Sequence, residues 1–201
     1  MDKWIKSITP EDVKGRSESA KALERSRSDA LKIARAIKHP WYRCQALSYI
    51  AGSDHSPSNS LPLLKEAVSA AYEQSDPNRI VSVASWPLRH FVKASPSKAE
   101  SLINRLLKTI AGEAHGLRKL DGISMVLNAV VSEKELRALV LPVFNNAATN
   151  SVGWRTDRIV AFAASNLAQF DLITAREMLV SRPLNKFSKK ISLEISSKNP
   201  L

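Results

Sequence analysis

The sequence contains few of the residues that build disulfide frameworks, tight turns or membrane spans. Of its 201 residues, 6 are glycine, 1 is cysteine and 6% are aromatic. The single cysteine, Cys44, cannot form an internal disulfide, and its neighbours Tyr42, Ala46 and Leu47 favour a small buried hydrophobe over a reactive thiol. No stretch approaches the roughly 18 apolar residues that a membrane span requires. We therefore expect neither a disulfide-stapled fold nor a membrane span.

The remaining composition is that of a folded helical protein. Hydrophobic residues make up 44% of the chain and charged residues 24%, which is ordinary globular usage. Alanine and leucine outnumber β-branched and aromatic residues in most segments, which favours helix over strand. The N-terminal stretch "MDKWIKSITPEDVKGRSESAK" has no apolar core of a signal peptide, so we expect a cytoplasmic location. The predicted fold class is all-α.

The chain is strongly basic. It has 30 lysines and arginines against 19 acidic residues, a formal net charge of +11, which favours nucleic acid, acidic proteins or anionic surfaces as partners. The excess is densest in a basic C-terminal tail, where Glu194 is the only acid among the cations Arg182, Lys186, Lys189, Lys190 and Lys198. The alternative is that these charges form a solvated face without a ligand.

One helix opening occurs twice in the sequence. The segments "NRIVSVASWPLRHF" (78–91) and "DRIVAFAASNLAQF" (157–170) align at an offset of 79, and their shared apolar residues follow one stripe of a helix. Weaker copies begin near residues 43 and 119. The same column of the stripe contains Leu47, Val83, Ile123 and Phe162, which we expect to be buried between helix layers.

Partner helices repeat between these copies. A Ser-Pro-Ser start recurs at Ser56 and Ser95, as suits a helix N-terminus, and Ser132 with Glu135 forms a potential capping box. The predicted architecture is an α-α superhelix, or solenoid, of about four antiparallel helix pairs with a unit of about 38 residues. We expect an N-terminal extension at 1–16, one repeat domain at 17–183 and the tail at 184–201. The predicted helices are 17–38, 41–52, 60–74, 77–93, 97–111, 115–130, 133–148, 155–169 and 172–181.

This pattern resembles the HEAT-like and tetratricopeptide-like superhelix proteins across roughly residues 20–185. The Trp, Leu-Gly and Tyr spacing of true tetratricopeptide repeats is missing, and the unit length is nearer to that of HEAT repeats. The resemblance implies a curved array with a concave face for a partner. It brings no catalytic residues and no cofactor.

A cation opens each copy of the helix, at Arg43, Arg79, Lys119 and Arg158. This position faces the positive end of the helix dipole, so some other interaction must hold the cation there. One interpretation is structural: the cations bind the last carbonyls of the preceding helix, or, for Arg79 and Arg158, the nearby Asp76 and Asp157. We expect this for Arg79 and Arg158. Arg43 has no acid nearby, and we expect it to be free.

The other interpretation is a ladder of cations along one edge of the solenoid, which would suit a phosphate backbone or an acidic peptide. Aromatic side chains near the cations could add stacking, although tryptophan is more often used in packing. The candidate partner-binding residues are therefore the four cations together with Trp41, Trp86, His90 and Trp154.

Sequence signatures of catalysis are missing. There is no glycine-rich phosphate loop, no cysteine pair with metal spacing and no nucleophile elbow, and the four histidines are scattered, so we assign no catalytic residue and no metal site. A lone carboxylate, Asp121 or Glu100, leaves an enzyme acting on nucleic acid as an alternative. The first hypothesis is a non-catalytic module that binds a protein or an acidic peptide. The second is a basic nucleic-acid-binding repeat protein.

Overall fold

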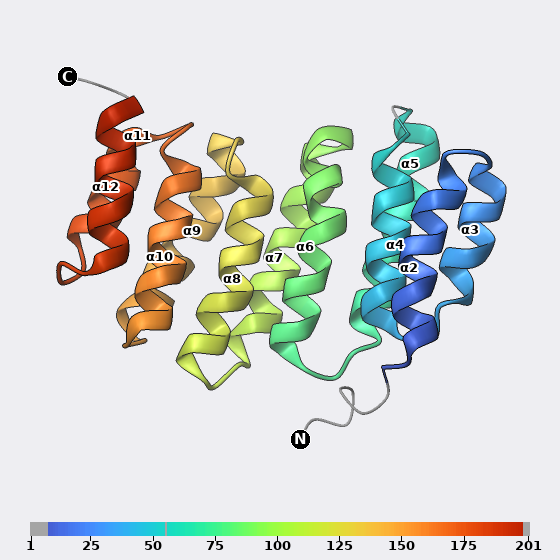
Figure 1. Cartoon of the computed structure of the whole chain (residues 1–201), viewed down its shortest axis with the longest axis horizontal. Helices are drawn as coiled ribbons and strands as arrows, with labels where there is room; N and C mark the ends of the chain where they lie inside the picture. The colour runs from blue at the N-terminus through green and yellow to red at the C-terminus, as the bar shows by residue number, and fades with distance from the viewer. Residues whose placement is uncertain (1–7, 55, 199–201) are drawn as a thin grey trace. The chain divides into compact units, whose positions relative to one another are not determined.

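The structure is a computed structural model that describes residues 8–54 and 56–198. These residues form α-helices and no strand (Figure 1), so the predicted all-α class is confirmed. The helices are α2 (Pro10–Leu23), α3 (Arg27–Ala36), α4 (Pro40–Gly52), α5 (Pro57–Tyr72), α6 (Pro77–Ala94), α7 (Pro96–Ala111), α8 (Gly116–Val130), α9 (Lys134–Thr149), α10 (Trp154–Leu167), α11 (Leu172–Val180) and α12 (Lys186–Lys198).

The helix starts follow the period expected from the sequence. One series, α4, α6, α8 and α10, starts at intervals of 37, 39 and 38 residues (77−40, 116−77, 154−116). The series between them, α5, α7, α9 and α11, starts at intervals of 39, 38 and 38 residues (96−57, 134−96, 172−134). Two helices per unit of about 38 residues is the arrangement that a helical repeat requires.

Local sequence fixes where these helices begin. Proline occupies the first turn of α4, α5 and α6, where its missing N–H breaks no helical hydrogen bond. The side chains of Asp76 and Asp171 accept hydrogen bonds from Arg79 N and Thr174 N and so cap α6 and α11. At Gly153, φ is +105°, a value that glycine adopts at little cost, and α10 begins at the next residue.

Both ends of the chain contain more helix than predicted. The helix predicted over 17–38 is two helices, because Ser26 caps α3 by accepting a hydrogen bond from Asp29 N. Residues 10–16, assigned to an extension from the sequence, open α2, where Thr9 and Asp12 form a capping box. Most of the predicted tail is α12, whose first turn is capped by Asn185 Oδ1. The 17–183 limits of a single repeat domain stay a prediction.

The described residues divide into two compact units, the first ending at Leu102 and the second beginning at Ile103, within α7. In the first unit, α4 packs against α2, α3, α5 and α6. In the second, α10 packs against α8, α11 and α12, and α8 packs against α9. Each unit has its own apolar core. Fully buried side chains include Leu47, Ile50, Leu64 and Leu88 in the first and Leu120, Ile123, Phe144 and Leu167 in the second.

The sequence predicts burial of four aligned residues of the repeated helix, and this burial is confirmed for three of them. Leu47, Val83 and Ile123 are fully buried, but Phe162 is 60% exposed, so its predicted burial is wrong. Helix α6 is buried at every residue from Ile80 to Ser85, which means that burial of Val83 does not fix the helical phase. On α10 the positions on either side, Ala161 and Ala163, face the core, and Phe162 projects from the opposite side.

Candidate functional site

Two of the four helix-opening cations close the C-terminus of the preceding helix. Arg43 Nη1 donates to the carbonyl oxygens of Ile37 at 3.0 Å and Lys38 at 3.3 Å, beyond the end of α3, and its Nη2 forms an ion pair with Glu73. Lys119 Nζ lies 3.4 Å from the carbonyl oxygen of Ala111, the last residue of α7. The structural interpretation is confirmed for these two cations, and the expectation that Arg43 is free is wrong.

The other two cations are Arg79 and Arg158. Asp76 caps α6 by accepting a hydrogen bond of 2.9 Å from the backbone N–H of Arg79. The pairing expected for the Arg79 side chain stays a prediction, because this contact is made by its backbone. The predicted pairing of Arg158 with Asp157 is wrong, because that carboxylate faces Arg182, with Oδ1 2.9 Å from Nε. The Arg158 guanidinium instead lies 5.5 Å from the centre of the Trp154 ring, and that of Arg155 lies 5.3 Å from the same ring.

Sequence reasoning missed a buried arginine of the same structural kind. Arg137, on α9, donates from Nη1 to the carbonyl oxygen of Val131 at 2.6 Å and from Nη2 to Asp171 at 3.3 Å. The contact repeats that of Arg43, because in both cases the accepting carbonyl lies six residues earlier and an acid from a later helix pairs with the same guanidinium. The signal in the sequence is a basic residue six positions after the C-cap of a helix, here Ile37 for Arg43 and Val131 for Arg137.

The other aromatic candidates are less accessible than Trp154. Trp41 and Trp86 are half-buried, whereas Trp154 is 56% exposed. The His90 ring lies directly over Gly52, where an added Cβ would be 2.1 Å from Cε1 of the ring. Burial lowers the pKa of His90, and the charges of Arg89 and Lys93 lower it further. His90 is thus a packing residue beside α4 and favours the neutral form.

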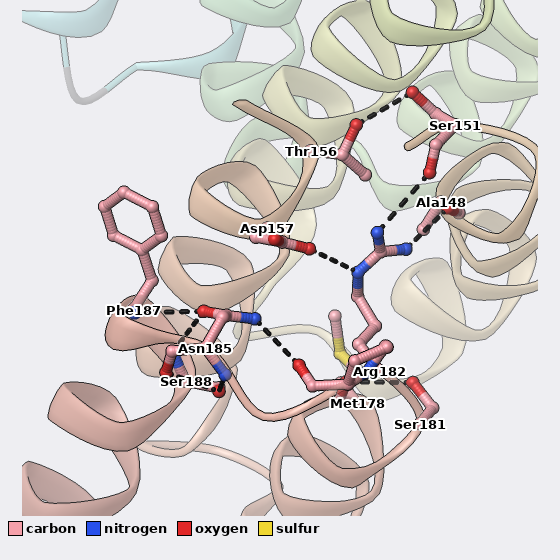
Figure 2. A network of polar contacts seen from close by, with 11 residues as sticks. Ala148, Ser151, Thr156, Asp157, Met178, Ser181, Arg182, Asn185, Phe187 and Ser188 are labelled. Atoms are coloured by element: carbon pink, nitrogen blue, oxygen red, sulfur yellow. Dashed lines mark hydrogen bonds and ion pairs between the residues drawn. The ribbon is translucent and has the colours of Figure 1, made fainter. Parts of the chain in front are cut away.

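The cations of the predicted tail have separate environments. Arg182 is held by three partners: Asp157, the carbonyl oxygen of Ala148 at 2.8 Å and that of Ser151 at 3.4 Å (Figure 2). Lys186 and Lys190 are exposed on α12. Lys186 Nζ is 5.1 Å from the Phe187 ring centre, and Lys190 Nζ is 3.9 Å from Glu194. Lys189 is also exposed.

Arg182 borders a cleft of about 610 Å³ in the second unit. Residues of α9, the start of α10, one side of α11 and the 181–185 connection line this cleft. Its apolar floor includes Phe144, Val160 and Met178, which are buried, and two exposed apolar residues, Val152 and Leu184, stand at its edge. The amino-acid pattern does not predict this cleft, because the cleft depends on how separate helices pack.

The charged groups in this cleft are mostly neutralised. The Arg182 guanidinium uses all three nitrogens within the protein, and the paired Asp157 carboxylate lies beside it (Figure 2). Glu177, also in the lining, is exposed and makes no ion pair with another described residue. The hydroxyls of Ser151, in the connection that leads into α10, and Thr156, in the first turn of α10, form a buried hydrogen bond of 2.8 Å. A ligand group that is mainly apolar and carries one small polar or cationic substituent would fit the lining of this cleft.

The described residues show no constellation for metal or nucleophilic chemistry. No group of three or more His, Cys, Asp or Glu side chains is placed to bind a metal in this part of the chain. Asp121 and Glu100, the lone carboxylates considered above, are exposed and do not line the cleft. Burial raises the pKa of the Cys44 thiol to about 12, so this side chain is a buried packing group, as predicted.

Comparisons with models of known protein families, with curated proteins and with solved structures find no match for this chain. Among the described helices, none has the length and hydropathy needed to cross a membrane.

Proposed function

We propose that the chain is a non-catalytic helical-repeat module of the HEAT-like or tetratricopeptide-like kind that binds a partner protein. The two interleaved series of helices with a period of about 38 residues support the repeat part of the proposal. The cleft of the second unit supports the binding part. In this proposal the partner inserts an apolar side chain, presented by a short amphipathic segment, between α9 and α11.

The observation that carries the proposal is apolar surface left in water around the cleft. Val152 is 89% exposed and Leu184 is 74% exposed, and both line a cavity whose floor is already apolar. Burying a side chain of this size stabilises a complex by about 1.5–3 kcal/mol, so two exposed anchors beside a preformed hollow favour association. The walls contribute polar groups that would set specificity, with Glu177 positioned for a cation of the partner segment.

The experiment uses a phage-displayed library of random peptides selected on the full-length chain. We expect enriched peptides to carry a large apolar residue, and we expect Leu184→Lys to weaken their binding by at least tenfold in fluorescence polarisation. Leu193→Lys is the matched control, because Leu193 is 72% exposed on α12 and does not line the cleft. Equal binding by the two variants would place the peptides elsewhere and overturn the cleft as the binding site. A library that yields no binder would count against a peptide-binding module.

A further inference from the structure

A second surface of the same unit has a different chemistry from the cleft. On α10, Trp154, Arg158 and Phe162 are spaced by four residues and are all exposed, so they form one stripe on the helix surface. The stripe extends about 12 Å from Trp154 to Phe162, at about 1.5 Å per residue. Arg155 adds a second guanidinium over the Trp154 ring.

The first turn of α12 continues this surface. Asp157 on α10 and Ser188 on α12 border one narrow gap, too small to hold a water molecule, which places the first turns of the two helices side by side, as Figure 2 also shows. In Figure 2 the Phe187 ring points away from the Arg182 network. The Nζ of Lys186 lies 5.1 Å from the centre of that ring. We call the set Trp154, Arg155, Arg158, Phe162, Lys186 and Phe187 the α10–α12 surface.

The cations of this surface are not neutralised by nearby acids. Arg155 and Arg158 have ring contacts with Trp154 and make no ion pair or hydrogen bond with another described residue. The two acidic residues of these helices are already engaged, since Asp157 pairs with Arg182 and Glu194 lies 3.9 Å from Lys190. The guanidinium donors of the two arginines are therefore available to an external anion.

Cations that alternate with exposed aromatic rings are the combination used to bind single strands. Unpaired bases stack on the rings and the backbone phosphates follow the cations, whereas a duplex keeps its bases stacked internally. An acidic peptide would use the cations but would leave the exposed Phe162 ring without a flat partner. On Trp154 a base can replace a guanidinium that turns to a phosphate. We propose that the α10–α12 surface binds single-stranded nucleic acid, with bases on Trp154 and Phe162 and phosphates on Arg155, Arg158 and Lys186.

The test measures fluorescence polarisation of a labelled thymidine homopolymer, and of a uridine homopolymer, with the full-length chain over a range of salt concentrations. Arg155→Gln/Arg158→Gln should weaken binding and lower the slope of log affinity against log salt by about 1.4, because each lost phosphate contact on a single strand removes about 0.7. Trp154→Ala should weaken binding roughly 5-fold to 150-fold, the range expected for loss of one stacked base, with little change in the salt slope.

The matched control is Lys108→Gln/Lys134→Gln. It removes the same charge from exposed positions of the same unit, outside the α10–α12 surface, and should change affinity by less than threefold. A loss in the control equal to that of the arginine pair would show binding to net charge alone and overturn the proposal. So would wild-type affinity of Trp154→Ala, binding of duplex as tight as that of the single strand, or preference for poly-glutamate over the homopolymers. Leu184→Lys should retain wild-type affinity, which separates this surface from the cleft proposed above.

Discussion

Arg182 Nε and Asp157 Oδ1 lie 2.9 Å apart, and the same guanidinium donates to the carbonyl oxygens of Ala148, in the last turn of α9, and of Ser151, which follows α9. One side chain therefore joins α9, α10 and the segment that follows α11. We expect Arg182→Gln to lower the free energy of unfolding by about 2–4 kcal/mol, because it removes charged hydrogen bonds and leaves Asp157 without its partner. Urea denaturation followed by circular dichroism measures the change.

Arg158→Gln is the control for this prediction. Its side chain is exposed, lies by the Trp154 ring and makes no ion pair or hydrogen bond with another described residue, so the change in unfolding free energy should stay below about 0.5 kcal/mol. Similar losses for Arg158→Gln and Arg182→Gln would contradict the assignment of Asp157 to Arg182.

Phe162 and Phe144 differ in burial, so replacing each with alanine should change the free energy of unfolding by clearly different amounts. Phe144 is fully buried, so Phe144→Ala should cost about 3–5 kcal/mol of unfolding free energy by loss of burial and creation of a cavity. Phe162→Ala should cost less than about 1 kcal/mol, because that ring is already in water. Paired urea melts decide the matter, and a large loss for Phe162→Ala would mean that another surface covers its ring.

Phe162 also shows that the spacing of apolar residues does not determine which side of a helix is buried. Apolar spacing predicted the all-α class and the repeat period, because both depend on the pattern along a single helix. It did not predict which side of α10 is covered, since that depends on which neighbouring helices pack there. Alignment with Val83 was uninformative because α6 is buried on nearly every side.

The candidate site was predictable to a smaller extent. Helix-end carbonyls as partners for cations could be expected from unsatisfied backbone groups, and Arg43 and Lys119 bear this out. For Asp157, the nearest cation in the sequence is not the partner in the structure. That carboxylate faces Arg182, 25 residues away, and not the adjacent Arg158, because neighbouring residues on a helix point in different directions.

The Asp171 carboxylate should make stability depend on pH. The hydrogen bond from Thr174 N–H and the Arg137 guanidinium hold the pKa of Asp171 below its ordinary value of 3.8. A carboxyl whose pKa is lower in the folded state contributes stability above pH 3.8 and loses that contribution as the pH falls through the folded pKa. Asp171→Asn should therefore cost about 1–3 kcal/mol at pH 7, because asparagine keeps the cap but not the charge. The difference from wild type in urea melts should shrink below pH 4, and a difference constant from pH 7 to pH 3 would contradict it.

The contact between Gly52 and His90 gives a test with a built-in rescue. An alanine Cβ at position 52 would lie 2.1 Å from His90 Cε1 and within 2.6 Å of both ring nitrogens, so the half-buried ring would have to move. Gly52→Ala should cost about 1–3 kcal/mol of unfolding free energy, the usual penalty for overpacking. In a His90→Ala background the ring is gone, and the same change should be neutral or should stabilise the protein by up to about 1 kcal/mol. Gly52 is the last residue of α4, and alanine favours the helical conformation more than glycine does. Thermal and urea melts of the four proteins give the coupling energy directly. A Gly52→Ala penalty that persists without the ring would show that backbone atoms, and not His90, require glycine at this position.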